Sequence, residues 1–106
     1  MGPMRDLTGK QRRHLRALGQ RLSATLNVGH EGVSEAVVAQ ADAQLEAHEL
    51  IKVRMSDTTP SDRHETAEDL AARTRAHLAQ VIGRTALLYR QRKDEPVIVL
   101  PAASAR

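Results

Sequence analysis

The feature that most constrains the fold is a repeated change of hydrophobic period, from stretches typical of helices to short stretches typical of strands. Residues 50–56, LIKVRMS, alternate: Ile51 and Val53 fall on one side, and Lys52 and Arg54 on the other. The preceding stretch instead repeats its apolar side chains at the spacing of one helix face. Because neither period suits the other element, the chain must pack helices against a sheet.

The elements follow one another in the order α-β-α-β-α-β-β. Helices are expected over 7–22, 34–49 and 62–78, and strands over 23–29, 50–56, 79–91 and 96–101. The charged residues 92–95 are expected to form the turn between the last two strands. This alternation predicts an α/β fold: a single compact domain with a four-stranded mixed sheet covered by helices.

Each predicted helix has an apolar side and a starting signal. Thr8 and Gln11 have the spacing of a capping box, and Ser34 is placed to cap the second helix. The side chains expected to face inward are Leu7, Leu15, Leu18 and Leu22 in the first helix, Val37, Val38, Ala41 and Leu45 in the second, and Ala67, Leu70, Ala71, Thr74 and Leu78 in the third. The acidic residues of the second helix, Glu35, Asp42, Glu46 and Glu49, are expected to project into solvent.

Charge is distributed in blocks along the chain. The net charge is only +3, but the first helix is basic, the second is acidic, and residues 84–93 are basic again. Arg12, Arg13 and Arg16 lie opposite the leucine side of the first helix, and Lys10 and Arg21 lie on one flank. This pattern is typical of a protein with one basic and one acidic side. A basic helix face is also compatible with simple solvation.

The composition bears on cellular location and on the ends of the chain. There is no cysteine, no apolar run long enough for a membrane span and no signal peptide pattern. A cytoplasmic protein that does not associate with membranes is therefore expected. Residues 1–6 are predicted to be a flexible arm, residues 7–101 a single domain, and residues 102–106 a flexible tail.

The sequence carries no recognisable catalytic constellation. Phosphate-binding loops of the Walker type, dinucleotide fingerprints and zinc-protease motifs are missing, and the five histidines are scattered. The interpretation is a protein that is not an enzyme, with no metal site and no cofactor.

The strongest local motif is the pair of glycines in residues 29–32, GHEG, between a predicted strand and a predicted helix. A glycine-rich loop lets backbone amides approach a phosphate, and the helix start adds its own N–H groups. Loops with the GxxG pattern clamp nucleotides in one class of RNA-binding module. A simple turn explains the same glycines, and Glu31 would repel phosphate.

Aromatic side chains are almost absent, with Tyr89 as the single Phe, Tyr or Trp. Stacking of bases on aromatic rings therefore cannot dominate any contact with nucleic acid. Binding would depend mostly on arginines, lysines and loop amides.

Several separated blocks resemble the CRM domain, the chloroplast RNA splicing and ribosome maturation family, whose stand-alone bacterial members are called YhbY-like RNA-binding proteins. The blocks are LTGKQRRHLRALGQRL, GHEGVSEAVV, HELIKVRM, ETAEDLAARTRAHLAQVIGRTALLYR and VIVLP, which run from Leu7 to Pro101. The resemblance implies a fold similar to the C-terminal domain of translation initiation factor three. It also implies binding to precursors of the large ribosomal subunit.

The family resemblance implies which residues contact RNA: Gly29, His30, Glu31 and Gly32 in the loop, Lys10, Arg12, Arg13 and Arg16 on the first helix, and Lys52 and Arg84. For Lys52 and Arg84, a scaffold role is equally open, and Gly83 is expected to form a bulge or a tight packing point. Two positions depart from the family pattern. Glu31 stands where a basic or small polar residue is common, and Arg75 where glycine is common.

The leading hypothesis is thus a monomeric, non-catalytic RNA-binding protein that acts on 23S-type ribosomal RNA in large-subunit precursors. The alternative is a protein-interaction adaptor of a ribosome-related assembly, in which the acidic face of the second helix docks a basic protein.

Overall fold

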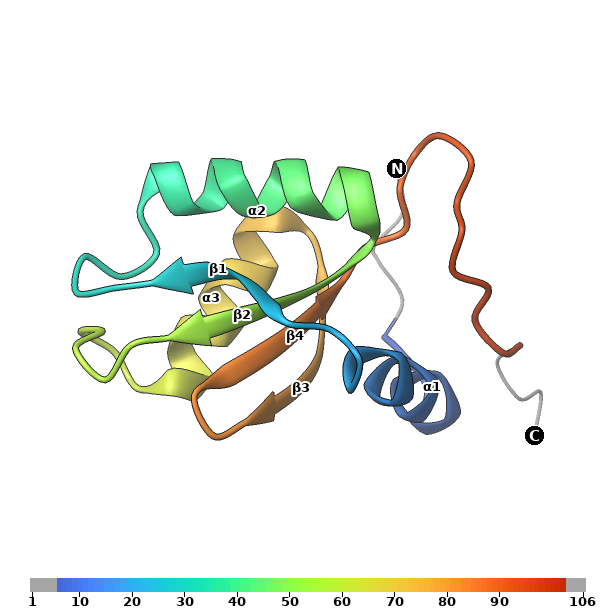
Figure 1. The fold of residues 1–106 in the computed structure, drawn as a ribbon, viewed down its shortest axis with the longest axis horizontal. Helices are drawn as coiled ribbons and strands as arrows, with labels where there is room; N and C mark the ends of the chain where they lie inside the picture. The colour runs from blue at the N-terminus through green and yellow to red at the C-terminus, as the bar shows by residue number, and fades with distance from the viewer. Residues whose placement is uncertain (1–5, 103–106) are drawn as a thin grey trace.

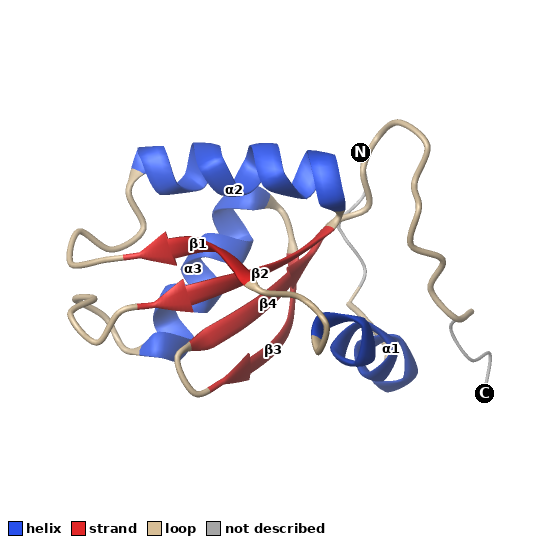
Figure 2. Ribbon diagram, in the orientation of Figure 1, coloured by secondary structure: helices blue, strands red, loops and turns tan. Residues whose placement is uncertain are grey.

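A four-stranded sheet forms the centre of the computed structural model, which describes residues 6–102 (Figure 1). The helices are α1 (Gly9–Gly19), α2 (Glu35–His48) and α3 (Arg63–Thr74), and the strands are β1 (Ala24–Val28), β2 (Leu50–Met55), β3 (His77–Ile82) and β4 (Thr85–Tyr89). The strand order is β1-β2-β4-β3, with β1 and β2 parallel and the other pairs antiparallel (Figure 2). The predicted fold class, a single α/β domain with a mixed sheet, is confirmed.

The two faces of the sheet have separate cores. Helices α2 and α3 cover one face, where Leu45 and Leu70 meet Val53 and Leu88 of the central strands. Helix α1 lies against one end of the other face, where Leu15 packs near Leu50, Leu87 and Tyr89. Among residues 6–102, no helix covers the rest of this second face (Figure 1).

The local signals at the helix starts are confirmed. Thr8 and Gln11 form the capping box, and the Ser34 side chain accepts a hydrogen bond from the Val37 backbone N–H. The predicted inward residues of α2 are buried or partly buried against the core, and Ala67, Leu70, Ala71 and Thr74 of α3 are buried.

The strand predicted over 79–91 is wrong in its extent, because the chain reverses in its middle. Gly83 has a φ of +56° and begins a two-residue turn with Arg84, after which Thr85 pairs with Ile82. Glycine at the first central position with a positive φ is typical of a hairpin turn that matches the twist of a sheet. Gly83 is therefore a turn residue and neither a bulge nor a packing point.

The strand predicted over 96–101 is also wrong. Residues 91–101 bend at 93–95 and then run on without strand pairing, and this segment is called here the C-terminal strap. Its alternation is real, since Ile98 and Leu100 pack on the α1 core while Val97 and Val99 are exposed. Side chains hold the strap in place, and it forms no backbone hydrogen bonds of a sheet. The Gln11 side-chain amide donates to the carbonyl of Pro101 at 3.0 Å, and the Glu49 carboxylate accepts from the backbone N–H of Val97.

Helix α3 ends at Thr74, four residues before the predicted end. Arg75 adopts a left-handed conformation with φ 58° and ψ 36°. The N–H of Ala76 donates to the carbonyl of Ala71 and the N–H of Arg75 to that of Ala72, which together form a Schellman motif. Leu78, predicted to lie inward on the helix, instead lies on β3, where it packs against the same core.

Helix α1 is shorter than predicted, and two of the four leucines expected to face inward are partly exposed. The helix ends at Gly19, where an added Cβ would lie 2.8 Å from the Leu87 side chain, so the chain passes too close to β4 for a larger residue. Leu7 and Leu15 are buried, but Leu18 and Leu22 remain 39% and 37% exposed. The helical period does not apply beyond Gly19, because the chain turns there toward β1.

Glu49 was expected in solvent, but it is only 1% exposed. Its carboxylate accepts hydrogen bonds from the backbone N–H groups of Arg92, Val97 and Ile98, at 3.0, 2.8 and 2.8 Å. It therefore anchors the C-terminal strap to the end of α2. The predicted flexible arm lies mostly outside the described residues, as does the tail beyond Ala102, and the domain limits of 7 and 101 stay a prediction.

Candidate nucleic-acid interface

The GHEG segment forms a tight turn directly after β1. The Gly32 N–H donates to the Gly29 carbonyl at 2.9 Å, and neither His30 nor Glu31 has a positive φ. Both side chains between the glycines are exposed. The Ser34 cap follows at once, so the loop lies beside the N-terminus of α2, where backbone N–H groups favour an anion.

The two glycines of this turn are required for different reasons. Gly32 has a φ of +72°, a conformation that other residues adopt at a cost, and an added Cβ would lie 3.4 Å from Pro60. Gly29 has no positive φ, and an added Cβ would meet nothing within 4 Å. The fold thus explains Gly32 but not Gly29, whose missing side chain leaves the backbone open to a partner.

The uncovered sheet face leads from this loop toward α1 and carries a row of polar and basic side chains. Lys52 is paired with Leu87, and Arg54 with Thr85 on one side and Asn27 on the other. Residues paired across strands share a face, so these side chains lie opposite α2 and α3. Arg54 was not among the predicted site residues, although the alternation of 50–56 already placed it on the same side as Lys52.

Two hollows line this face. One, of about 190 Å³, lies between Asn27, Arg54 and Arg84, at the end of the sheet where the GHEG loop begins. The other, of about 160 Å³, lies between Arg16 of α1 and Lys52. Lys52 and Arg54 are two residues apart on β2, so the hollows adjoin. We call Arg16, Lys52, Arg54 and Arg84 the basic row.

The remaining basic residues predicted on α1 lie at the opposite end of the sheet from the loop (Figure 1). Lys10, Arg12 and Arg13 are exposed, and Arg12 donates from Nη1 to the Leu78 carbonyl on the edge strand β3 at 3.2 Å. The structure therefore brings Arg16 together with Lys52, but it does not bring the other three to the GHEG loop.

Among residues 6–102, no ion pair joins the basic row to a carboxylate, although Asp57 lines the same hollow as Arg54 and Arg84. The ion pairs in this range join Arg73 to Asp69, and Arg90 to Asp42 and Glu46. The last two acids belong to the α2 face proposed to dock a basic protein, so Arg90 already neutralises part of that face. Positive charge is unpaired on one face of the sheet, while negative charge on α2 is partly paired.

Three groups near the strap and α1 have shifted pKa values. Burial alone would raise the pKa of Glu49, but the N–H groups of Ile98, Arg92 and Val97 and the charge of Arg92 bring it below its usual value. Burial lowers the pKa of His77, which nearby Asp6 opposes and Arg12 reinforces. Burial and the charge of Glu49 raise the pKa of Tyr89.

Tyr89 is not available for stacking on bases. It is 4% exposed, and its ring stacks on His77 with centroids 6.2 Å apart. Residues 6–102 hold no group of three side chains suited to bind a metal ion. In the same part of the chain, every helix is too short or too polar to span a membrane.

Comparison with known proteins assigns the family. The model of the CRS1 / YhbY (CRM) domain matches residues 7–90, which include every element of the sheet and all the predicted site residues. The chain belongs to the CRM domain family. The resemblance seen in the separated sequence blocks is therefore confirmed.

Two relatives of this CRM domain protein cover 80% and 90% of its length. "Probable RNA-binding protein YqeI" of Bacillus subtilis is 40% identical over 95 residues, which span 90% of this chain and 99% of the relative. "Probable RNA-binding protein PA4753" of Pseudomonas aeruginosa is 36% identical over 85 residues, or 80% and 82% of the two chains.

A solved structure shows the same fold. The solution structure of SAV1595 from Staphylococcus aureus, described as a hypothetical protein and a putative RNA-binding protein, is 41% identical. It superposes with a TM-score of 0.78 and covers 90% of this chain and 99% of its own.

Proposed function

We propose that this CRM domain protein binds RNA, catalyses no reaction on it, and acts as a monomer in the cytoplasm. The observation that carries the proposal is the basic row, whose cations lack carboxylate partners within residues 6–102 and lead to a loop whose first glycine the fold does not need. Unpaired cations in a row match the spaced charges of a phosphate backbone. The relatives described as probable RNA-binding proteins support the same function.

We further propose how the residues share this task. The GHEG loop offers backbone amides to one phosphate, with Gly29 allowing close approach. Lys52, Arg54 and Arg84 then follow the backbone across the sheet, and Arg16 extends the path to α1. Lys10, Arg12 and Arg13 attract the RNA from the far end of the sheet. Such contacts read the shape and charge of folded RNA more than its sequence.

The proposed target is 23S-type ribosomal RNA in precursors of the large subunit, as the family resemblance implies. Crosslinking the protein to RNA in its native cells, followed by sequencing of the attached fragments, tests this target. Enrichment on one region of large-subunit RNA is expected. Fragments spread over many transcripts would retain RNA binding and reject the target.

The salt dependence of binding tests the mechanism on purified protein and a recovered RNA hairpin. Phosphate contacts release counterions, so affinity should fall steeply, by at least tenfold between roughly 50 and 200 mM salt. An affinity independent of salt would contradict the role of the basic row. Protein partners that survive nuclease treatment in a pull-down, with no RNA recovered, would favour the adaptor alternative.

A further inference from the structure

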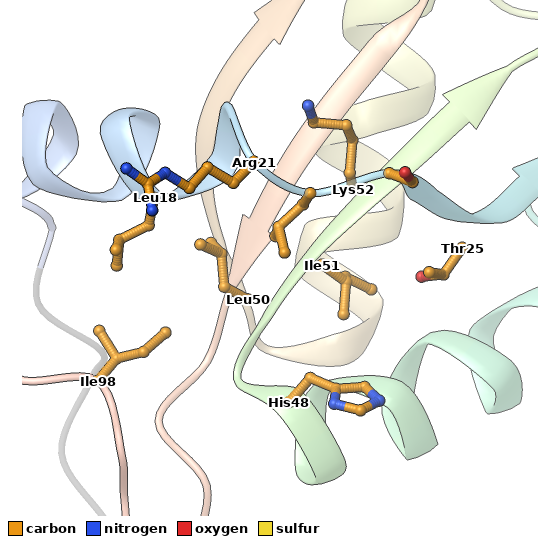
Figure 3. Close-up of a pocket in the computed structure, with 10 residues that line it drawn as sticks. Leu18, Arg21, Thr25, His48, Leu50, Ile51, Lys52 and Ile98 are labelled. Carbon is orange, nitrogen blue, oxygen red and sulfur yellow. The ribbon is translucent and has the colours of Figure 1, made fainter.

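An apolar groove of about 490 Å³ opens beside the basic row, and Lys52 is the one predicted RNA contact among the residues that line it (Figure 3). It lies where β2 begins: β1 pairs with β2 only from Ala24 opposite Lys52, so Leu50 and Ile51 have no β1 neighbour. The groove volume lies within the range of small-molecule clefts, roughly 300 to 1,000 Å³.

The walls of the groove are aliphatic and come from three parts of the chain. Leu50 and Ile51 of β2 and Ile98 of the strap face Leu18 and Leu22 from the end of α1. Leu18 and Leu22 were expected in the core, yet both keep more than a third of their surface exposed. Their exposure gives the groove an apolar rim that the fold itself does not bury.

The polar residues around the groove are basic or neutral. Arg21 and Lys52 lie along one side and His48 lies on the opposite side (Figure 3). Ser23 and Thr25 complete the rim, and no carboxylate lines it. A flat apolar ligand that carries negative charge on its flanks complements this arrangement.

We infer that the groove receives a single unstacked nucleotide of the bound RNA, with its base between the aliphatic walls and its flanking phosphates at Arg21 and Lys52. This inference rests on the proposed RNA-binding function. Lys52 lines both this groove and the hollow shared with Arg16, so one RNA backbone can follow the basic row and place a base here. Apolar side chains also hold extruded bases in nucleic-acid enzymes, and this chain has no exposed Tyr, Phe or Trp among its described residues to do so.

The test compares two RNA hairpins that differ by one unpaired nucleotide, a bulged and a fully paired form. The double variant Leu18→Ser/Leu22→Ser should lower affinity for the bulged hairpin roughly five- to tenfold, since loss of a base-stacking surface has effects of this order. Affinity for the paired hairpin should not change. Val99→Ser, which replaces an exposed aliphatic residue outside the groove, is the matched control and should leave both affinities unchanged.

A second readout does not depend on affinity. A photoactivatable thiouridine placed at the bulge should crosslink to peptides that contain residues 18–25 or 48–52. Thermal unfolding of each variant checks that the fold is retained, which the exposure of both leucines predicts.

The outcomes separate the inference from the function on which it rests. If the serine variant binds both hairpins as the wild type does, while Lys52→Ala/Arg54→Ala weakens both, the protein binds RNA and the groove inference is wrong. In that case the groove would suit an apolar side chain of a protein partner. If the wild type binds neither hairpin nor any recovered RNA, the proposed function fails, and the inference fails with it.

Discussion

The two faces of the sheet use the same strands for different purposes. On one face, α2 and α3 bury Val53, Leu88 and their neighbours, and two arginines on this side, Arg73 and Arg90, are paired with acids. On the other face, α1 and the strap cover only one end, and the open remainder carries Lys52 and Arg54 without carboxylate partners in the described chain. The alternation of β2 supplies both surfaces at once, since each second residue points to the opposite face.

The two faces differ in how far helices cover them, and the open part of the sheet is the surface available to RNA. The side chains of α2 and α3 fill the covered face, so changes in its buried core should alter stability first. The half-covered face combines a small core with exposed charge, so changes there should divide into those that loosen the cover and those that weaken RNA binding.

The largest effect on stability is expected at Glu49, which anchors the C-terminal strap. Glu49→Ala removes the acceptor of three backbone N–H groups of the strap and should lower the free energy of unfolding by about 2–3 kcal/mol. Chemical denaturation measures this change. A loss below about 0.5 kcal/mol, the usual range for surface substitutions, would show that the strap does not depend on Glu49.

The same carboxylate predicts a pH dependence. Its pKa in the folded protein lies below the ordinary value of 4.5, so its ionised form stabilises the fold above that pH. This contribution is lost as the pH falls from 4.5 through the folded pKa. Glu49→Gln should therefore be less stable than the wild type at neutral pH, and the difference should shrink in acid. A constant difference would contradict the role of the charge.

The next effect concerns charge on the open face. Lys52→Ala/Arg54→Ala should reduce RNA affinity about 10- to 100-fold and should reduce the slope of log affinity against log salt by roughly 1.5 to 2, while stability is retained. Lys93→Glu, which makes the same change of two in net charge within the strap, is the control. If Lys93→Glu weakens binding equally, total charge and not the open face determines affinity.

A smaller pair of effects separates the two glycines of the turn. Gly32→Ala should destabilise by about 1–2 kcal/mol because of its positive φ. Gly29→Ala should leave stability unchanged or raise it by up to about 1 kcal/mol, while it weakens RNA binding several-fold. Unfolding curves and RNA titrations of both variants measure the two quantities. If Gly29→Ala bound RNA with the affinity of the wild type, the loop backbone at Gly29 would not contact RNA.

The smallest effect is expected at the C-terminal end of α3, on the covered side of the sheet. Arg75→Gly relieves a left-handed residue at the end of α3 and should stabilise the protein by about 0.5–1 kcal/mol. RNA affinity should not change, because Arg75 lies outside the basic row. A loss of affinity would show that this departure from the family pattern adds an RNA contact.

The sequence predicted the elements whose signals are local. The capping box at Thr8, the cap at Ser34 and the alternation of β2 depend on neighbours a few residues apart, and the structure confirms them. The family resemblance supplied most of the candidate site. Arg54 could have been added from the same alternation that singled out Lys52.

The failures depend on contacts between distant residues or on single backbone angles. Glu49 has the helical spacing of an exposed acid, and its partners in the strap lie 43 to 49 residues later. Residues 96–101 alternate like a strand because they pack on the α1 core without entering the sheet. Gly83 and Arg75 each reverse the chain through a positive φ, which composition and periodicity do not reveal.

The most direct test of the account is to map RNA contacts on the amide resonances of the protein during titration with a recovered RNA hairpin. We predict shifts concentrated on the open face: the GHEG loop, Lys52, Arg54 and the turn at Gly83 and Arg84. Resonances of α2 beyond its first turn and of the core of α3 should not move. Shifts confined to those two helices, with the basic row unchanged, would contradict the assignment of the half-covered face as the RNA-binding surface.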